Sequence, residues 1–185
     1  MYTWNLAFLL LLLLAAAWHD IRSRRIPNAL VFPGAVIGVL SNALLPLEMG
    51  GLGVLDSMAG LGVGLMLLLP LYLLRAMGAG DVKLMAMTGA FLGVRGVTGA
   101  LLCVLLAGGV LALVTAWHEG KLRRLLHKLR MTLFTSAAGD STGSLAAAGN
   151  LPKSAKESAT GLPYGVAIAA GTVAYLVLAH WAAGQ

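Results

Sequence analysis

Gly78-Ala79-Gly80-Asp81-Val82-Lys83-Leu84 places one carboxylate at the mouth of an apolar segment, and the rest of the chain is organised around it. Two glycines precede Asp81, and glycine lets other groups approach the backbone closely. A second carboxylate, Asp20, lies at the end of the first apolar segment. A charge in such surroundings is costly and usually has a function. We therefore expect Asp20 and Asp81 to meet and to form an acid/base pair.

The composition indicates an integral membrane protein. Of the 185 residues, 59% are hydrophobic and 11% are charged, whereas soluble domains carry about 25% charged residues. A single cysteine, Cys103, excludes an intramolecular disulfide and a zinc site built from several cysteines. The histidines lack metal-ligand spacing, so we expect neither a metal nor a cofactor. We expect one membrane-embedded domain, residues 1–185.

The apolar segments predict an all-α polytopic fold. Pro27 stops the first helix from continuing, and Asn28 can cap the second. The fourth segment is short, which places Asp81 at a depth similar to that of Asp20. The expected six transmembrane helices are residues 2–18, 29–47, 52–74, 81–94, 96–117 and 162–181.

The long loop between the fifth and sixth predicted helices, residues 118–160, has two parts. Residues 118–134 carry leucines on one face of a helix and five basic residues on the other, which favours an amphipathic helix on an anionic lipid surface. A solvated cytoplasmic helix is the alternative. Residues 135–160 are rich in Ala, Ser, Gly and Thr and predict a flexible loop.

The distribution of basic residues predicts the topology. If Asp20, Asp81 and the 118–160 loop share one face, that face holds 12 of the 13 Lys and Arg residues, and only Arg95 lies on the other. The positive-inside rule makes the basic face cytoplasmic and places both termini outside. The 12 residues are Arg22, Arg24, Arg25, Arg75, Lys83, Lys121, Arg123, Arg124, Lys128, Arg130, Lys153 and Lys156.

Two carboxylates within a few ångströms cannot both ionise cheaply, so one keeps a proton and the pair titrates as a unit. The ionised member can take a proton from water while the neutral member hydrogen-bonds the substrate carbonyl, as in aspartic proteases. Other interpretations remain open: Asp81 as a helix N-cap, Asp20 as the partner of Arg22 or Arg24, and Lys83 as an interfacial lysine or a residue that tunes the pair.

These motifs resemble a known family. Gly78-Ala79-Gly80-Asp81 resembles the Gly-x-Gly-Asp motif of polytopic aspartic proteases. Together with Asp81-Val82-Lys83-Leu84, and with Asp20 before Arg-x-x-x-Ile-Pro-Asn, it is similar to the type IV prepilin peptidase family. Pro163-Tyr164-Gly165 resembles the closing motif of that family, so the resemblance covers essentially the whole chain.

The resemblance implies a function and a set of site residues. Asp20 and Asp81 would be the catalytic pair of an aspartic endopeptidase in the cytoplasmic (inner) membrane. The family removes the short basic leader of prepilins at the cytoplasmic face, just before the hydrophobic helix of the pilin, for pili and protein secretion. The residues expected to bind substrate or to support the pair are Gly78, Gly80, Lys83, Pro27, Asn28, Pro163, Tyr164 and Gly165.

The chain also departs from the larger members of that family. Those members carry an N-terminal cytoplasmic domain with paired cysteines, and they methylate the new N-terminus of the pilin. This chain has neither that domain nor those cysteines, so it resembles the small peptidase-only form, and N-methyltransferase activity is not expected. The alternative from another class is a non-enzymatic subunit of a secretion or pilus machine, or an ion or proton pathway with inward carboxylates.

Overall fold

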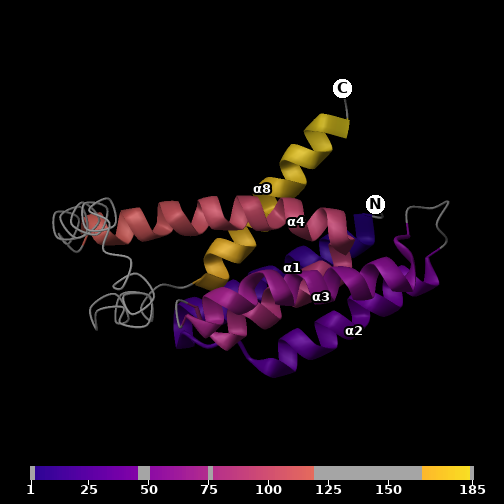
Figure 1. The fold of residues 1–185 in the computed structure, drawn as a ribbon, viewed down its shortest axis with the longest axis horizontal. Coiled ribbons are helices and arrows are strands. Elements are labelled where there is room, and N and C mark those ends of the chain that lie inside the picture. Colours follow the sequence, from indigo (N-terminus) through magenta and orange to yellow (C-terminus); the bar gives the residue numbers. More distant parts are fainter. Residues whose placement is uncertain (1–2, 46–50, 75–76, 119–163, 184–185) are drawn as a thin grey trace, which may run out of the picture. The chain divides into compact units, whose positions relative to one another are not determined.

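The protein is all-α in the part of the chain that the computed structural model describes, which is residues 3–45, 51–74, 77–118 and 164–183. Four helices, α1, α3, α4 and α8, are long and apolar enough to cross a membrane, and α2 is a shorter apolar helix. The prediction of an all-α membrane protein is therefore confirmed. The helices are α1 (Thr3–Ser23), α2 (Asn28–Leu44), α3 (Gly53–Leu73), α4 (Ala79–His118) and α8 (Tyr164–Ala183) (Figure 1).

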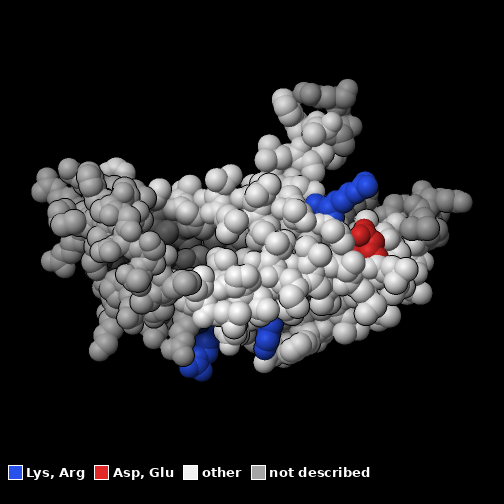
Figure 2. Space-filling model, viewed as in Figure 1, with Lys and Arg blue, Asp and Glu red and all other residues white. Residues whose placement is uncertain are grey.

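The chain divides into two compact units, and both aspartates belong to the first. That unit comprises residues 1–108 and 163–185, and the second comprises residues 109–162. The predicted lipid-binding segment and flexible loop lie outside the described residues, apart from His118. In the view of Figure 2, most of the described surface carries no charge, and the Lys, Arg, Asp and Glu side chains lie near its margins.

The first helix is longer than predicted. It continues beyond residue 18 to Ser23, so Asp20 lies in the helix near its end. Arg24 follows with a left-handed backbone (φ 50°), and its N–H donates to the Asp20 carbonyl at 2.8 Å. A left-handed residue with this hydrogen bond is a common way to end a helix, although glycine usually occupies the position.

The predicted cap of the second helix is wrong. Pro27 occupies the N-cap position of α2, and no side chain caps the helix there. Asn28 is already the first helical residue. Its side-chain oxygen instead accepts a hydrogen bond from Lys83 of α4, which draws the amide away from the free backbone groups of its own helix.

The predicted fourth and fifth helices form one element, α4, with a break inside it. At Gly93 the backbone leaves the helical region (φ 69°, ψ −175°), two residues before Arg95, where the sequence suggests the boundary. The two parts, residues 79–92 and 94–118, are about 21 Å and about 37 Å long at 1.5 Å per residue. The described residues thus contain five helices, and a count of six spans requires α4 to cross the membrane twice.

Polar side chains from α2 and α3 satisfy the backbone groups that this break leaves without helical partners. Asn42 donates to the Ala90 carbonyl at 3.0 Å, and Ser57 donates to the same carbonyl. Asp56 accepts from the Val94 N–H at 3.4 Å. Buried backbone groups without partners cost about 1–3 kcal/mol each, so these contacts stabilise the break.

The first part of α4, which carries Asp81, packs closely against α2 and α3. Gly60 of α3 faces the backbone of Gly89, and a Cβ at Gly34 of α2 would lie 2.5 Å from the Met87 sulfur. Small residues at membrane helix interfaces permit such close approach. Met87 is fully buried. This close packing joins the part of α4 that carries Asp81 to α2 and α3.

Candidate active site

Asp20 is held by the beginning of α8. Its side chain is 6% exposed, and its Oδ2 accepts the Gly165 N–H at 2.7 Å. The backbone N–H of Val166, the next residue, also acts electrostatically on the carboxylate. α8 begins at Tyr164, so these amides belong to the first helical turn, whose donors have no partner within the helix. The positive end of the α8 dipole therefore faces a carboxylate that lies near the negative end of α1.

The close approach of α8 to Asp20 requires a glycine. A Cβ at Gly165 would lie 2.8 Å from Oδ2 and 3.0 Å from Cβ of Asp20. Tyr164, the residue before it, is half-buried and packs near Gly108 of α4. Of the predicted Pro163-Tyr164-Gly165 motif, the structure thus places two residues at the site, and Pro163 lies outside the described residues.

Asp81 is held by the beginning of its own helix. Its side chain is 8% exposed, and its Oδ2 accepts the Gly78 N–H at 3.1 Å. In return the Asp81 N–H donates to the Gly78 carbonyl at 3.2 Å. α4 begins at Ala79, so Asp81 is the third helical residue and reaches back to the capping position. The alternative of Asp81 as the N-cap itself is therefore wrong, because Gly78 occupies that place.

The structure brings the two aspartates close enough for their charges to interact. The charge of Asp81 also acts on the phenol of Tyr164. The connection between α1 and α2 closes the site from another side, because a Cβ at Gly80 would lie 3.2 Å from Cβ of Ile26. Three separate parts of the chain thus meet there: the end of α1, the beginning of α4 and the beginning of α8.

Lys83 links α4 to α2. Its Nζ donates to Oδ1 of Asn28 at 3.1 Å and lies 5.3 Å from the centroid of the Phe32 ring. This distance permits a cation–π interaction. Pro27, beside Asn28, accepts the Leu30 N–H at 3.0 Å through its carbonyl. The lysine thus anchors the beginning of α2 to the helix of Asp81, and its two sequence-based interpretations stay predictions.

Several contacts at the site are not evident in the sequence. The left-handed Arg24 lies four residues after Asp20, and its charge acts on the Asp20 carboxylate. Ile26 and Phe32 support Gly80 and Lys83. The only signal in the sequence was the basic run that follows Asp20, which also indicates the cytoplasmic face. The Pro163-Tyr164-Gly165 motif marked the start of the last predicted helix, but nothing in the sequence indicated which residue that helix start would hold.

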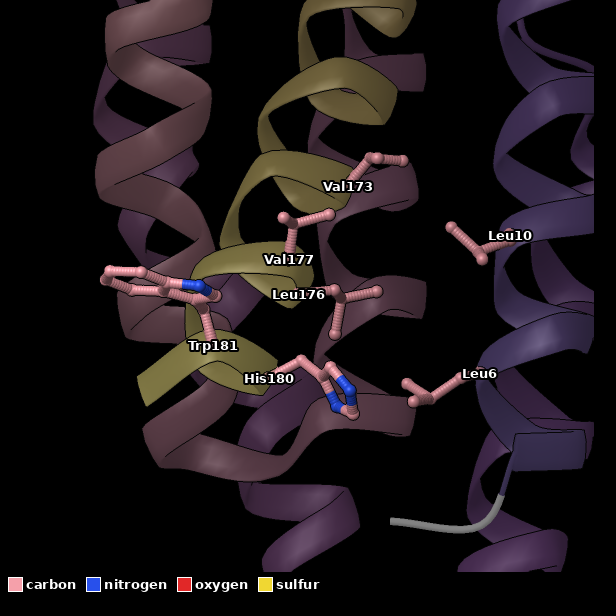
Figure 3. Close-up of a pocket in the computed structure, with 7 residues that line it drawn as sticks. All are labelled: Leu6, Leu10, Val173, Leu176, Val177, His180 and Trp181. Atoms are coloured by element: carbon pink, nitrogen blue, oxygen red, sulfur yellow. The ribbon is translucent and has the colours of Figure 1, made fainter. Parts of the chain in front are cut away.

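A groove of about 300 Å³ lies elsewhere on the same unit, between the first half of α1 and the second half of α8 (Figure 3). Leu6 and Leu10 of α1 face the side chains of α8 there. Its lining contains no carboxylate and one histidine, so it offers no acid/base pair. The residues from α8 are Val173, Leu176, Val177, His180 and Trp181.

The chemical capacity of the site lies in the remaining oxygens of the two carboxylates. Each Oδ2 is bound to a backbone amide. Within the described ranges, no hydrogen bond from a protein group reaches either Oδ1, so these oxygens can bind a water molecule or a substrate. Two carboxylates that share one proton can act as general base and general acid together.

Comparison with known proteins identifies the family. No curated protein and no solved structure matches the chain. A sequence model described as "Type IV leader peptidase family" matches residues 7–113, which is more than half of the 185 residues and includes both Asp20 and Asp81. The chain therefore belongs to the type IV leader peptidase family, whose members are proteases, and its apolar helices are those of a multi-pass membrane protein.

Proposed function

We propose that this protein is a membrane aspartic endopeptidase that removes the basic leader of prepilin-like proteins, with Asp20 and Asp81 as the catalytic pair. One observation carries the proposal: two carboxylates from distant parts of a leader peptidase chain are both buried, interact electrostatically, and are each held at the start of a helix. Buried carboxylates without such a function are uncommon, because the burial of their charge is costly.

The proposed reaction is the hydrolysis of one peptide bond without a covalent intermediate. One carboxylate takes a proton from a water molecule as the oxygen of that water bonds to the substrate carbonyl carbon. The other carboxyl group gives its proton to the carbonyl oxygen. When the tetrahedral intermediate collapses, the C–N bond breaks and the leaving nitrogen receives the first proton. The pair then shares one proton again.

The backbone contributes preorganisation to this reaction. The Gly78 and Gly165 amides hold one oxygen of each carboxylate, so neither aspartate has to be reoriented when the substrate arrives. Groups fixed before the reaction avoid the reorganisation cost that flexible groups incur in the transition state. The link between Lys83 and Asn28 supports the same arrangement from the side of α2.

The location that we propose is the cytoplasmic side of the inner membrane, with six spans and both termini outside. The distribution of basic residues supports it, and the break at Gly93 supports two crossings by α4. A reporter active only in the cytoplasm should be silent after Gln185 and active near Ser144. The opposite pattern would place the aspartates on the face where leaders do not emerge.

The test of the function is a cleavage assay with purified protein in detergent and a pilin that carries its basic leader and hydrophobic helix. We expect cleavage just before the hydrophobic helix, without an ion gradient. An ion or proton pathway would have no activity in this assay, so the absence of cleavage would count against the peptidase. The anionic-lipid role of residues 118–134 lies outside the described residues and stays a prediction.

A further inference from the structure

The two aspartates are buried to nearly the same extent, yet they receive different hydrogen bonds. The side chain of Asp20 is 6% exposed and that of Asp81 is 8% exposed. Asp20 accepts one short hydrogen bond of 2.7 Å from Gly165, and the nearby Val166 amide adds a favourable electrostatic interaction. Asp81 accepts one bond of 3.1 Å from Gly78. Short bonds from several amides favour the charged form of a carboxylate.

The charges around the two aspartates differ in the same direction. Arg24 is the cation whose charge acts on Asp20. The charge that acts on Asp81 is that of Asp20 itself, and the phenol of Tyr164 is the other titratable group beside it. Lys83, although only two residues after Asp81, donates to Asn28.

Arg24 ends α1 in a backbone conformation that side chains disfavour. Among the described residues, Arg24 is the non-glycine residue with positive φ. L-residues with side chains are strained in this region, and glycine is not. The Arg24 N–H donates to the Asp20 carbonyl at 2.8 Å, so the two residues are neighbours at the end of α1. A glycine would end α1 with less strain but would remove the cation.

We propose that Asp20 carries the negative charge of the pair, that Asp81 holds its proton, and that Arg24 is a positioning residue that keeps the charge at Asp20. This assignment rests on the proposed function. Asp20 then takes the proton from the attacking water as the O–C bond forms, while Asp81 gives its proton to the carbonyl oxygen. As the C–N bond breaks, the proton on Asp20 passes to the leaving nitrogen and Asp81 regains its own from the hydroxyl of the intermediate.

Carbon NMR of the full chain in detergent tests the assignment without relying on activity. With ¹³C at the aspartate carboxyl carbons, the chain gives four signals, from Asp20, Asp56, Asp81 and Asp140. Single Asp→Asn variants assign them. At the pH of fastest cleavage, we expect the Asp20 signal at the ionised position and the Asp81 signal at the protonated position. The reverse assignment, or two signals that titrate together, would overturn the proposal.

Three variants at one position test the role of Arg24. Arg24→Lys keeps the charge, and we expect its kcat/KM to stay within about twofold of wild type. Arg24→Gly removes the strain, so we expect its thermal midpoint to rise by about 2–4 °C. It also removes the charge, so we expect kcat/KM to fall about fivefold, which corresponds to the loss of the interaction between two exposed unit charges. Arg24→Asn tolerates the left-handed backbone without a charge, and we expect a similar fall.

Arg25→Gln is the matched control, because it removes an adjacent exposed charge and should change neither kcat/KM nor the Asp20 signal. The Asp20 signal should move toward the protonated position in Arg24→Gly and Arg24→Asn but not in Arg24→Lys. Wild-type activity and an unmoved Asp20 signal in Arg24→Gly would overturn the role of Arg24. If the wild-type protein cleaves nothing, the result counts against the proposed function. The NMR signals would still show which aspartate is ionised, because that measurement does not depend on cleavage.

Discussion

Asp81 and Asp20 are each held at the beginning of a helix, but the two helices have different origins. Asp81 binds the amide of Gly78, three residues before it, so a single turn of chain forms this half of the site. Asp20 binds the amide of Gly165, which is 145 residues away in the sequence. One half of the site is therefore local, and the other exists only when α8 packs against α1.

The two halves also differ in how much space they leave. A Cβ at Gly165 would lie 2.8 Å from Oδ2 of Asp20, whereas a Cβ at Gly78 would lie 3.3 Å from Oδ2 of Asp81. The first distance is shorter than real contacts allow, so something must move. The second is a tight contact that a small shift of the side chain can relieve. The distant half should therefore tolerate substitution less well than the local half.

The largest expected effect comes from removal of either carboxylate. Asp20→Asn and Asp81→Asn should each reduce kcat for prepilin cleavage by about 10³-fold or more, because neither variant can complete the proton transfers. The double variant should be no slower than either single variant, since groups that act as a unit are not additive. Rates are measured with purified protein in detergent, alongside a thermal melt of each variant.

Arg95→Ala is the control for this series, because Arg95 is exposed beside the break in α4 and away from the site. We expect it to cleave at the wild-type rate. If either Asn variant cleaves near that rate, the assignment of the pair is wrong and the comparison of the two halves loses its functional meaning.

The next effect tests the asymmetry directly. Gly165→Ala should reduce kcat by about 10²-fold, because displacement of a catalytic group by about 1 Å can cost that much. The mechanism is a shift of either Asp20 or the first turn of α8. Steady-state kinetics should show the loss in kcat, and Gly165→Ser should be at least as slow.

Gly78→Ala is the matched substitution in the local half. The contact at 3.3 Å can relax within one turn, and the Gly78 N–H remains available to Asp81. We expect kcat to fall by about threefold at most. Equal losses of kcat in Gly78→Ala and Gly165→Ala would contradict this expectation. They would show that the distance along the chain between a carboxylate and its donor does not determine how well the site tolerates substitution.

A smaller effect should follow loss of the link between Lys83 and Asn28. This hydrogen bond is exposed, so Lys83→Ala and Asn28→Ala should each lower the free energy of unfolding by about 0.5–1 kcal/mol. We expect kcat to change by about twofold or less. In a double-mutant cycle the two losses should not add, because each substitution removes the same bond. Fully additive losses would contradict the contact.

The smallest effect on activity is expected for Gly62→Ala in α3. Nothing lies within 4 Å of a Cβ at this position, so the added methyl group meets open space. Alanine is preferred over glycine inside a helix, and the unfolding free energy should rise by about 0.5–1 kcal/mol. Cleavage should be unchanged. Loss of cleavage here would show that the effects of Gly165→Ala and Gly78→Ala come from helix packing in general and not from the site.

The sequence was sufficient for the parts of the site that depend on neighbours along the chain. The apolar segments predicted an all-α membrane protein, and the motifs around Asp20 and Asp81 predicted the family that the sequence comparison then identified. Helix boundaries were less accurate. α1 continues to Ser23 and ends where Arg24 turns left-handed. The break in α4 occurs at Gly93, whose backbone conformation glycine adopts readily, and Asp56 of α3 binds the next amide.

Hydropathy indicates the environment of each segment, and short motifs indicate contacts within one helical turn. The contact of Gly78 with Asp81 is of the second kind, because the two residues are three positions apart. Hydropathy and short motifs contain no information about which helix start faces which carboxylate. The contacts of Gly165 with Asp20 and of Lys83 with Asn28 join segments that meet through helix packing. Such packing depends on the shapes of whole helix faces, such as the small residues that bring α3 to α4, and these shapes act together only in the folded chain.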